Sequence, residues 1–152
     1  MRVSAKVDYA VRAMVELAVA AGDGPVKGEQ LARAQAIPVN FLENILGELR
    51  RAGLVGSQRG ADGGYWLALP AERINVAEVI RVVEGPLADV HGTAPENLAY
   101  AGSAKSLQSV WIATRANLRA VLEQVTIADI ADGRLPALVK SLADDPDAWA
   151  RR

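Results

Sequence analysis

Polar side chains able to recognise bases gather on one side of the helix expected between Ile37 and Arg51. At about 100° per residue, Asn40, Glu43 and Asn44 fall opposite an apolar row. Asn can form two hydrogen bonds with adenine, and Glu can accept one from cytosine. These residue types at this spacing indicate a short face that reads DNA bases. A solvated Glu43, or one that holds an Arg in place, is the alternative interpretation of this carboxylate.

Gly47 stands at the centre of this polar side. A Gly inside a helix destabilises it by up to about 1 kcal/mol relative to Ala, so its presence indicates another use. Without a side chain there, the helix backbone could lie close to a flat or grooved surface. The opposite side is predicted to face the core and consists of Leu42, Ile45, Leu46 and Leu49.

A two-stranded hairpin is predicted directly after this helix. Gly53 can end the helix in a left-handed conformation, LVGSQ and YWLAL have the composition of strands, and RGADGG supplies the turn. Helix plus hairpin is how a winged helix-turn-helix presents itself to DNA. Arg59 beside Gly60, at the hairpin tip, could enter a narrow minor groove, which attracts Arg. An ordinary exposed Arg is the alternative.

Helical spacing and turn residues predict the other elements. Ser4 can cap a first helix that runs to about Ala21, and KGEQLARAQA reads as a second helix. The amphipathic stretch INVAEVIRVVEG closes a DNA-binding domain predicted over residues 1–85. A loop follows over 86–103, then a long helix with a short helix after it over 104–132, and a tail over 133–152. The stretch TIAD, from Thr126 to Asp129, resembles a capping box that starts the short helix.

The long helix carries more apolar surface than a small winged domain can cover. Its apolar positions recur three and four residues apart, which predicts a dimer seam by the logic of coiled coils. Folding back onto its own domain is the alternative. The predicted fold class is therefore mainly α with a small β-hairpin, a winged helix-turn-helix plus a long C-terminal dimerisation helix. The predicted dimerisation residues are Leu107, Val110, Trp111, Thr114, Leu118, Val121 and Leu122.

The overall charge argues mildly against nucleic-acid binding. The 152 residues have a formal net charge of −1 and a pI of about 5.8, whereas DNA-binding domains are often basic. Residues 1–75 hold nine Lys or Arg against eight Asp or Glu, and the remainder hold eight against ten. Affinity would therefore come from local placement of basic side chains and from two copies acting together.

Nothing in the sequence predicts a membrane, metal or enzyme function. There is no run of about 18 apolar residues, and the charged start is unlike a signal peptide, so a cytoplasmic location is expected. The absence of Cys excludes disulfides, thiolate zinc sites and Cys-ligated iron–sulfur clusters. His91, the single His, has only Asp89 and Glu96 as nearby candidate ligands, so a surface role is expected. No nucleophile–base pair or phosphate loop is apparent.

Several of these stretches together resemble one family. MRVSAKVDYAVRAMVELA, the pattern IP..FLE.IL.ELRRAGLV.S.RG..GGY.LA and VIRVVEG are similar to the Rrf2 family of bacterial transcription regulators, over most of residues 1–132. The resemblance implies a homodimer in which each winged domain reads half of a palindromic operator. The half-sites would lie one helical turn, or a multiple of it, apart. Double-stranded DNA and a second copy of the chain are the expected partners.

The departure from the family is as informative as the match. Cluster-binding members carry three Cys before the long helix, whereas the segment from Leu87 to Gln108 contains none. Lys105 stands near the position of the last Cys, and a protonated ammonium cannot replace a thiolate ligand. The chain therefore resembles the cluster-free branch, no iron–sulfur cluster is expected, and the effector is unknown.

Further residues complete the set of predicted sites. Trp66, out of phase with the inward residues of its strand, and Tyr100 and Trp111, beside the loop, form a candidate effector pocket. Trp66 could instead contact the partner's long helix or cover apolar surface. Lys6, Arg50 and Arg51 are predicted phosphate contacts, or merely solubilising. The predicted DNA contacts are Lys6, Val39, Asn40, Glu43, Asn44, Arg50, Arg51, Arg59 and Gly60.

The function predicted from the sequence is a sequence-specific DNA-binding transcription regulator, most simply a homodimeric repressor on a palindromic operator. The alternative is a winged helix that docks a protein partner rather than DNA, because many small domains of this shape serve that purpose. Enzymatic activity is not expected.

Overall fold

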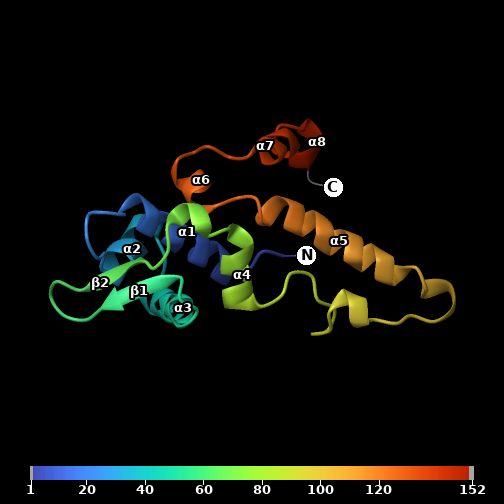
Figure 1. Ribbon diagram of the computed structural model, residues 1–152, viewed down its shortest axis with the longest axis horizontal. Helices are drawn as coiled ribbons and strands as arrows, with labels where there is room; N and C mark the ends of the chain where they lie inside the picture. Colours follow the sequence, from blue (N-terminus) through green and yellow to red (C-terminus); the bar gives the residue numbers. More distant parts are fainter. Residues whose placement is uncertain (1, 151–152) are drawn as a thin grey trace.

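Helix α1 (Ala5–Val19) lies at the centre of the winged domain, where α2, α3, α4 and α6 contact it (Figure 1). The structure is a computed structural model and describes residues 2–150. Met1 of the predicted winged domain, and Arg151 and Arg152 of the predicted tail, lie outside the described residues. As predicted, the Ser4 hydroxyl caps α1 by accepting a hydrogen bond from the Val7 N–H at 3.1 Å. The residues that α1 buries are Val7, Ala10, Ala13, Met14 and Leu17.

The elements that surround α1 form a helix-turn-helix followed by a hairpin. The full order is α1, α2 (Gly28–Gln35), α3 (Val39–Arg51), β1 (Val55–Gln58), β2 (Gly64–Leu67), α4 (Val76–Glu84), α5 (Leu107–Leu122), α6 (Ile127–Ala131), α7 (Ala137–Ala143) and α8 (Pro146–Trp149). Short 3-10 turns at Ala71–Arg73, Pro95–Asn97 and Gly102–Ala104 complete it. The mainly helical fold with one small hairpin is thus confirmed.

Helix α3 follows the turn after α2 and buries one side. Pro38 precedes its first residue, and Gly53, with φ of 80°, follows its last turn in the left-handed region. The buried residues are the four predicted from the sequence, Leu42, Ile45, Leu46 and Leu49. The opposite side of α3 is therefore left for contact with another molecule.

The wing is an antiparallel pair, with Val55 opposite Leu67 and Gln58 opposite Gly64. Its strands are shorter than the stretches predicted from the sequence. Val26, just before α2, adds a bridge to Tyr65 through two backbone hydrogen bonds of 2.9 and 2.8 Å. The hairpin is thereby tied to the helix-turn-helix rather than being free to swing.

Helix α6 returns to the winged domain after the long helix. The predicted capping box is present, because the Thr126 hydroxyl accepts from the Asp129 N–H and the Asp129 carboxylate accepts from the Thr126 N–H. Ile127 is fully buried and its N–H donates to the Ile74 carbonyl at 2.8 Å. The short helix that the sequence grouped with the dimerisation helix therefore lies in the core of the winged domain.

Helix α5 projects away from the winged domain (Figure 1). None of its sixteen residues is buried in the described protomer. The segment 86–103, predicted as a loop, runs alongside it and contains one 3-10 turn and the start of a second. No helix within residues 2–150 has both the length and the apolar character needed to cross a membrane.

The region predicted as a tail contains secondary structure. Helices α7 and α8 form after Pro136, and the Trp149 indole N–H donates to the Ala143 carbonyl at 2.6 Å. Their apolar side chains stay exposed, with Trp149 80% accessible and Leu138 and Leu142 also on the surface. These two helices contact each other.

Candidate nucleic-acid interface

The outward side of α3 brings together the predicted base-reading residues. Val39, Asn40, Glu43 and Asn44 lie on its first two turns, and all four are exposed. Their side chains are therefore free to meet base edges in a groove wide enough for a helix. The basic residues Arg50 and Arg51 extend the exposed surface to the end of the helix.

Gly47 leaves open space on this side of α3. A Cβ built there would meet only the Arg51 guanidinium at 3.6 Å, an ordinary contact distance. Packing inside the protomer therefore gives no reason for Gly at this position. Close approach of the helix backbone to another surface, as inferred from the sequence, stays a prediction.

The wing tip presents Arg59 away from the body. Within residues 2–150, its side chain has no hydrogen bond or ion pair, and Gly60 beside it has φ of 103°, which only Gly adopts readily. The Lys27 ammonium donates to the Gly60 carbonyl at 2.6 Å. Lys27 therefore fixes the tip relative to the start of α2, and no local sequence signal pairs two residues 33 positions apart.

Arg50 joins α3 to the wing. Its guanidinium donates to the Ser57 hydroxyl at 3.2 Å while the side chain stays exposed. The exposed side of α3 is thus linked through Arg50 to β1 of the hairpin, whose tip carries Arg59. A cationic border beside a base-reading helix is the arrangement by which phosphate contacts position a protein on DNA.

Lys6, a predicted phosphate contact, is engaged inside the protomer. Its ammonium lies 2.8 Å from the Glu48 carboxylate and donates to the Val83 carbonyl at 2.8 Å. These contacts link α1 to α3 and to α4. The predicted contact of Lys6 with phosphate stays a prediction, because the ammonium would have to leave or share these partners.

An aromatic pair missed by the sequence reasoning supports the start of α3. The Tyr9 and Phe41 rings meet edge to face with centroids 5.7 Å apart, and the Arg12 guanidinium lies 4.9 Å from the Tyr9 centroid. Arg12 also donates to the Gln35 carbonyl at 2.8 Å. This cluster fixes the turn between α2 and α3, and the i, i+3 spacing of Tyr9 and Arg12 was its only sequence signal.

The candidate effector residues fall into two separate places. Trp66 packs over Gly56 on the opposite strand, where a Cβ would lie 2.4 Å from the indole, and it lines a cavity of about 690 Å³ with Leu17 and Ala128. Tyr100 and Trp111 instead pair with each other through a 3.0 Å hydrogen bond. Strand β2 and the start of α5 lie at opposite ends of the molecule (Figure 1). In the described protomer the three residues therefore do not line one common pocket, and their role in effector binding stays a prediction.

The predicted dimerisation residues of α5 are only partly available for contact with a second copy of the chain. Val110 is 52% exposed, but Leu118 and Leu122 line a cavity of about 480 Å³ against Val7 and Ile80 of the same protomer. Leu107, Trp111, Thr114 and Val121 are half-buried. Ile112, which is not one of the predicted dimerisation residues, is 41% exposed. The exposed apolar side of α5 is thus rotated about the helix axis relative to the side that carries the predicted dimerisation residues.

The segment before α5 offers no metal centre. The sequence has no Cys, and no three potential ligands among His, Asp and Glu come together within residues 2–150. Glu96 instead lies 2.6 Å from the Arg115 guanidinium. A hydrogen bond from its own backbone N–H, then Arg115, lowers the pKa of the Glu96 carboxyl. The residues present do not fit a cysteine-ligated cluster.

The helix-turn-helix with its hairpin and exposed third helix defines a winged helix-turn-helix DNA-binding protein. The chain belongs to the Rrf2 family, since the model of that family, described as an iron-dependent transcriptional regulator, matches residues 3–133. Members of the family are transcription regulators and not enzymes. The protein is accordingly a DNA-binding transcription regulator.

Individual relatives support this assignment. Rv1287 of Mycobacterium tuberculosis, which carries the name of an HTH-type transcriptional regulator, is 52% identical over 145 residues, 95% of this chain and 90% of that protein. IscR of Cereibacter sphaeroides is 36% identical over 95% of this chain and its own full length. The solved structure of CymR, the global cysteine regulator of Bacillus subtilis, superposes with a TM-score of 0.74 at 34% identity, covering 88% of this chain and 98% of that one.

Proposed function

We propose that the protein binds a palindromic operator as a homodimer, with each α3 in the major groove of one half-site and each Arg59 in the flanking minor groove. The observation that carries this proposal is the exposed polar side of α3, interrupted by a Gly47 that the protomer itself does not need. A helix without bulk at its midpoint can lie deeper in a groove.

The dimer contact in this proposal is α5. A sixteen-residue helix with no buried residue, and with Val110 and Ile112 exposed, is only partly covered by its own protomer. In proteins, helices of this length owe most of their stability to packing. The α5 helix of a second copy supplies that packing. The two-fold axis of the dimer then relates the two α3 helices to each other.

We infer that regulation proceeds without an iron–sulfur cluster. Thiolates hold such clusters, the chain has no Cys, and the segment that binds the cluster in relatives is held here by Glu96 and Gln108 contacts to α5. Repression is the regulatory sign in this proposal, because a dimer that covers promoter DNA would obstruct RNA polymerase.

The test is selection of genomic DNA fragments by the purified full-length protein, followed by footprinting of the selected sites. We expect a protected palindrome whose half-sites lie one helical turn, or a multiple of it, apart. Protection of an asymmetric single site would contradict the dimer. Absence of any protected DNA, together with recovery of a stoichiometric protein partner, would favour the protein-docking alternative.

A further inference from the structure

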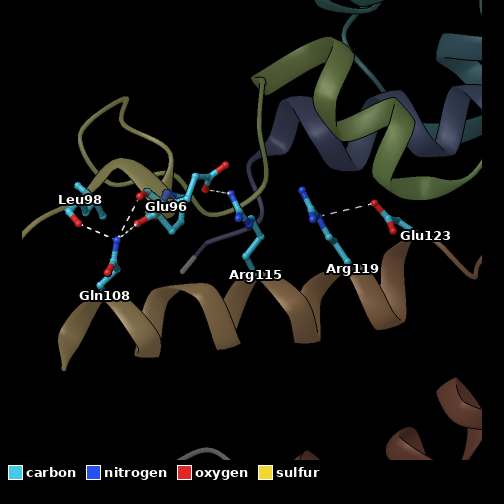
Figure 2. Close-up of polar contacts among 7 residues, drawn as sticks. Glu96, Leu98, Gln108, Arg115, Arg119 and Glu123 are labelled. Carbon is cyan, nitrogen blue, oxygen red and sulfur yellow. Dashed lines mark hydrogen bonds and ion pairs between the residues drawn. The ribbon is translucent and has the colours of Figure 1, made fainter.

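Three arginines converge on a small pocket between α4 and α5. The pocket has a volume of about 340 Å³ and is lined by Arg81 of α4, Arg115 and Arg119 of α5, and by Pro86 and Leu87. It lies where the winged domain meets the projecting helix. Figure 2 shows Arg115 and Arg119 pointing from the same side of α5 toward the segment that carries α4. We call it the arginine pocket.

The carboxylates around the arginine pocket do not balance its charge. Arg81 pairs with Glu123, and Arg115 pairs with Glu96 at 2.6 Å. The Arg119 guanidinium approaches Glu123 only to 3.9 Å, and its side chain makes no hydrogen bond with any of residues 2–150. Three guanidinium groups therefore face two carboxylates, one of which is shared.

This concentration of positive charge is not explained by packing. Arg115 and Arg119 are four residues apart on one helix, where like charges repel. The Arg115 side chain is also only 15% exposed, so it is largely removed from water. An aliphatic side chain at position 119 would avoid the repulsion while covering the same surface. The arrangement fits a site that takes up a negative charge.

We propose that the arginine pocket binds a small oxyanion, a carboxylate or phosphate-type group with at least two oxygens, that bridges the winged domain to α5. Planar guanidinium groups bind two such oxygens at once. Arg119 supplies unoccupied donors, and Arg115 and Arg81 supply further donors from the two sides. Leu87, which is nearly buried, and Pro86 form an apolar wall that limits the size of the ligand.

The bound anion would compete with Glu96 for Arg115. Glu96 belongs to the segment before α5, and Gln108 of α5 holds the same segment by donating to the carbonyls of Pro95, Glu96 and Leu98 at 3.3, 3.2 and 2.7 Å (Figure 2). Displacement of the Glu96 carboxylate removes one attachment of this segment to α5 and leaves those made by Gln108 and by the Trp111–Tyr100 hydrogen bond. Binding is thereby coupled to the position of the segment.

The test is calorimetric titration of the full-length protein, without DNA, with citrate, inorganic phosphate and sulfate at constant ionic strength set by sodium chloride. We expect saturable binding of at least one anion, and movement of the arginine Nε–H NMR signals of Arg81, Arg115 and Arg119. Preference for citrate identifies a carboxylate ligand, and preference for phosphate or sulfate identifies an inorganic-type oxyanion.

Four variants make the result specific. Arg119→Gln should weaken binding about tenfold or more, as loss of one charge-assisted hydrogen bond predicts. Glu96→Gln should tighten it about twofold to fivefold, the equivalent of an exposed ion pair. Arg134→Gln, which removes an exposed arginine elsewhere, should leave it unchanged. Arg59→Gln, at the wing tip, should also leave it unchanged.

Absence of saturable binding by all three anions would overturn the proposal, as would equal affinities for Arg119→Gln and Arg134→Gln. Weaker binding in Arg59→Gln would place the anion on the DNA-facing surface and would likewise overturn it. Because no DNA is present in the titration, failure here leaves the proposed operator reading untouched. Failure to select an operator, in turn, does not affect this titration.

Discussion

The ammonium of Lys6 on α1 lies 2.8 Å from the carboxylate of Glu48 on α3. The same ammonium donates to the last turn of α4 through the Val83 carbonyl. One side chain on α1 therefore ties α3 to α1 and α4. A residue predicted from the sequence to contact phosphate has a structural use in the free protomer.

Replacement of Lys6 by Met should destabilise the protein by about 1–2 kcal/mol, because a charge-assisted hydrogen bond and a partly exposed ion pair are lost. Urea unfolding measures this change, and a double-mutant cycle with Glu48→Gln should show that the two losses are not additive. Lys140→Met, on exposed α7, is the matched control. Unchanged stability combined with weaker DNA binding would assign Lys6 to phosphate instead.

Gly47→Ala should separate folding from DNA binding. The added Cβ meets only Arg51 at 3.6 Å, and Ala favours a helix by up to about 1 kcal/mol over Gly. We therefore expect a higher unfolding temperature together with weaker operator binding. Thermal unfolding and a binding titration on the same preparation test both. A stabilised variant with full DNA affinity would show that the α3 backbone does not approach DNA closely.

Arg59→Gln should reduce operator affinity and lower the slope of log K against log salt by about one, the contribution of one phosphate-neutralising charge. Arg134→Gln removes an arginine whose side chain is 80% exposed and lies after α6 in the sequence, outside the hairpin, so it is the control for net charge. Binding titrations over a salt series measure the slope. If both variants gave the wild-type slope, the wing tip would play no part in binding.

The capping box of α6 should make stability sensitive to acid. Hydrogen bonds from the Thr126 N–H and then the Thr126 hydroxyl lower the pKa of the Asp129 carboxyl below its ordinary 3.8. A carboxyl whose pKa is lowered on folding stabilises the protein above the unfolded pKa, and that stabilisation is lost as pH falls through the folded pKa. Wild type should therefore lose stability more steeply than Asp129→Asn below about pH 4. If the free energies of unfolding of wild type and Asp129→Asn, measured with urea, changed in parallel with pH, this role of Asp129 would be ruled out.

The sequence predicted local features well because local spacing determines them. The buried side of α3, the Ser4 cap and the Thr126–Asp129 capping box all depend on residues three or four positions apart. It did not predict the Lys27 contact to Gly60, the engagement of Lys6, or the return of α6 to the core, since each joins distant segments.

The rotation of the free side of α5 was missed for a related reason. Apolar spacing predicts which residues avoid water, but not whether the same protomer or another copy covers them. Leu118 and Leu122 face the winged domain of their own chain, whereas Ile112 remains exposed. Only the packed structure distinguishes these two kinds of apolar residue.

The mass of the complex on its operator tests the central claim most directly. Native mass spectrometry and sedimentation of the full-length protein with one selected operator should show two protomers on one DNA duplex. Ile112→Glu, which places a charge on the exposed side of α5, should yield monomers and lose most of the affinity, while Ser141→Glu on α7 should behave as wild type. A single protomer bound to the operator at wild-type affinity would contradict the dimeric regulator.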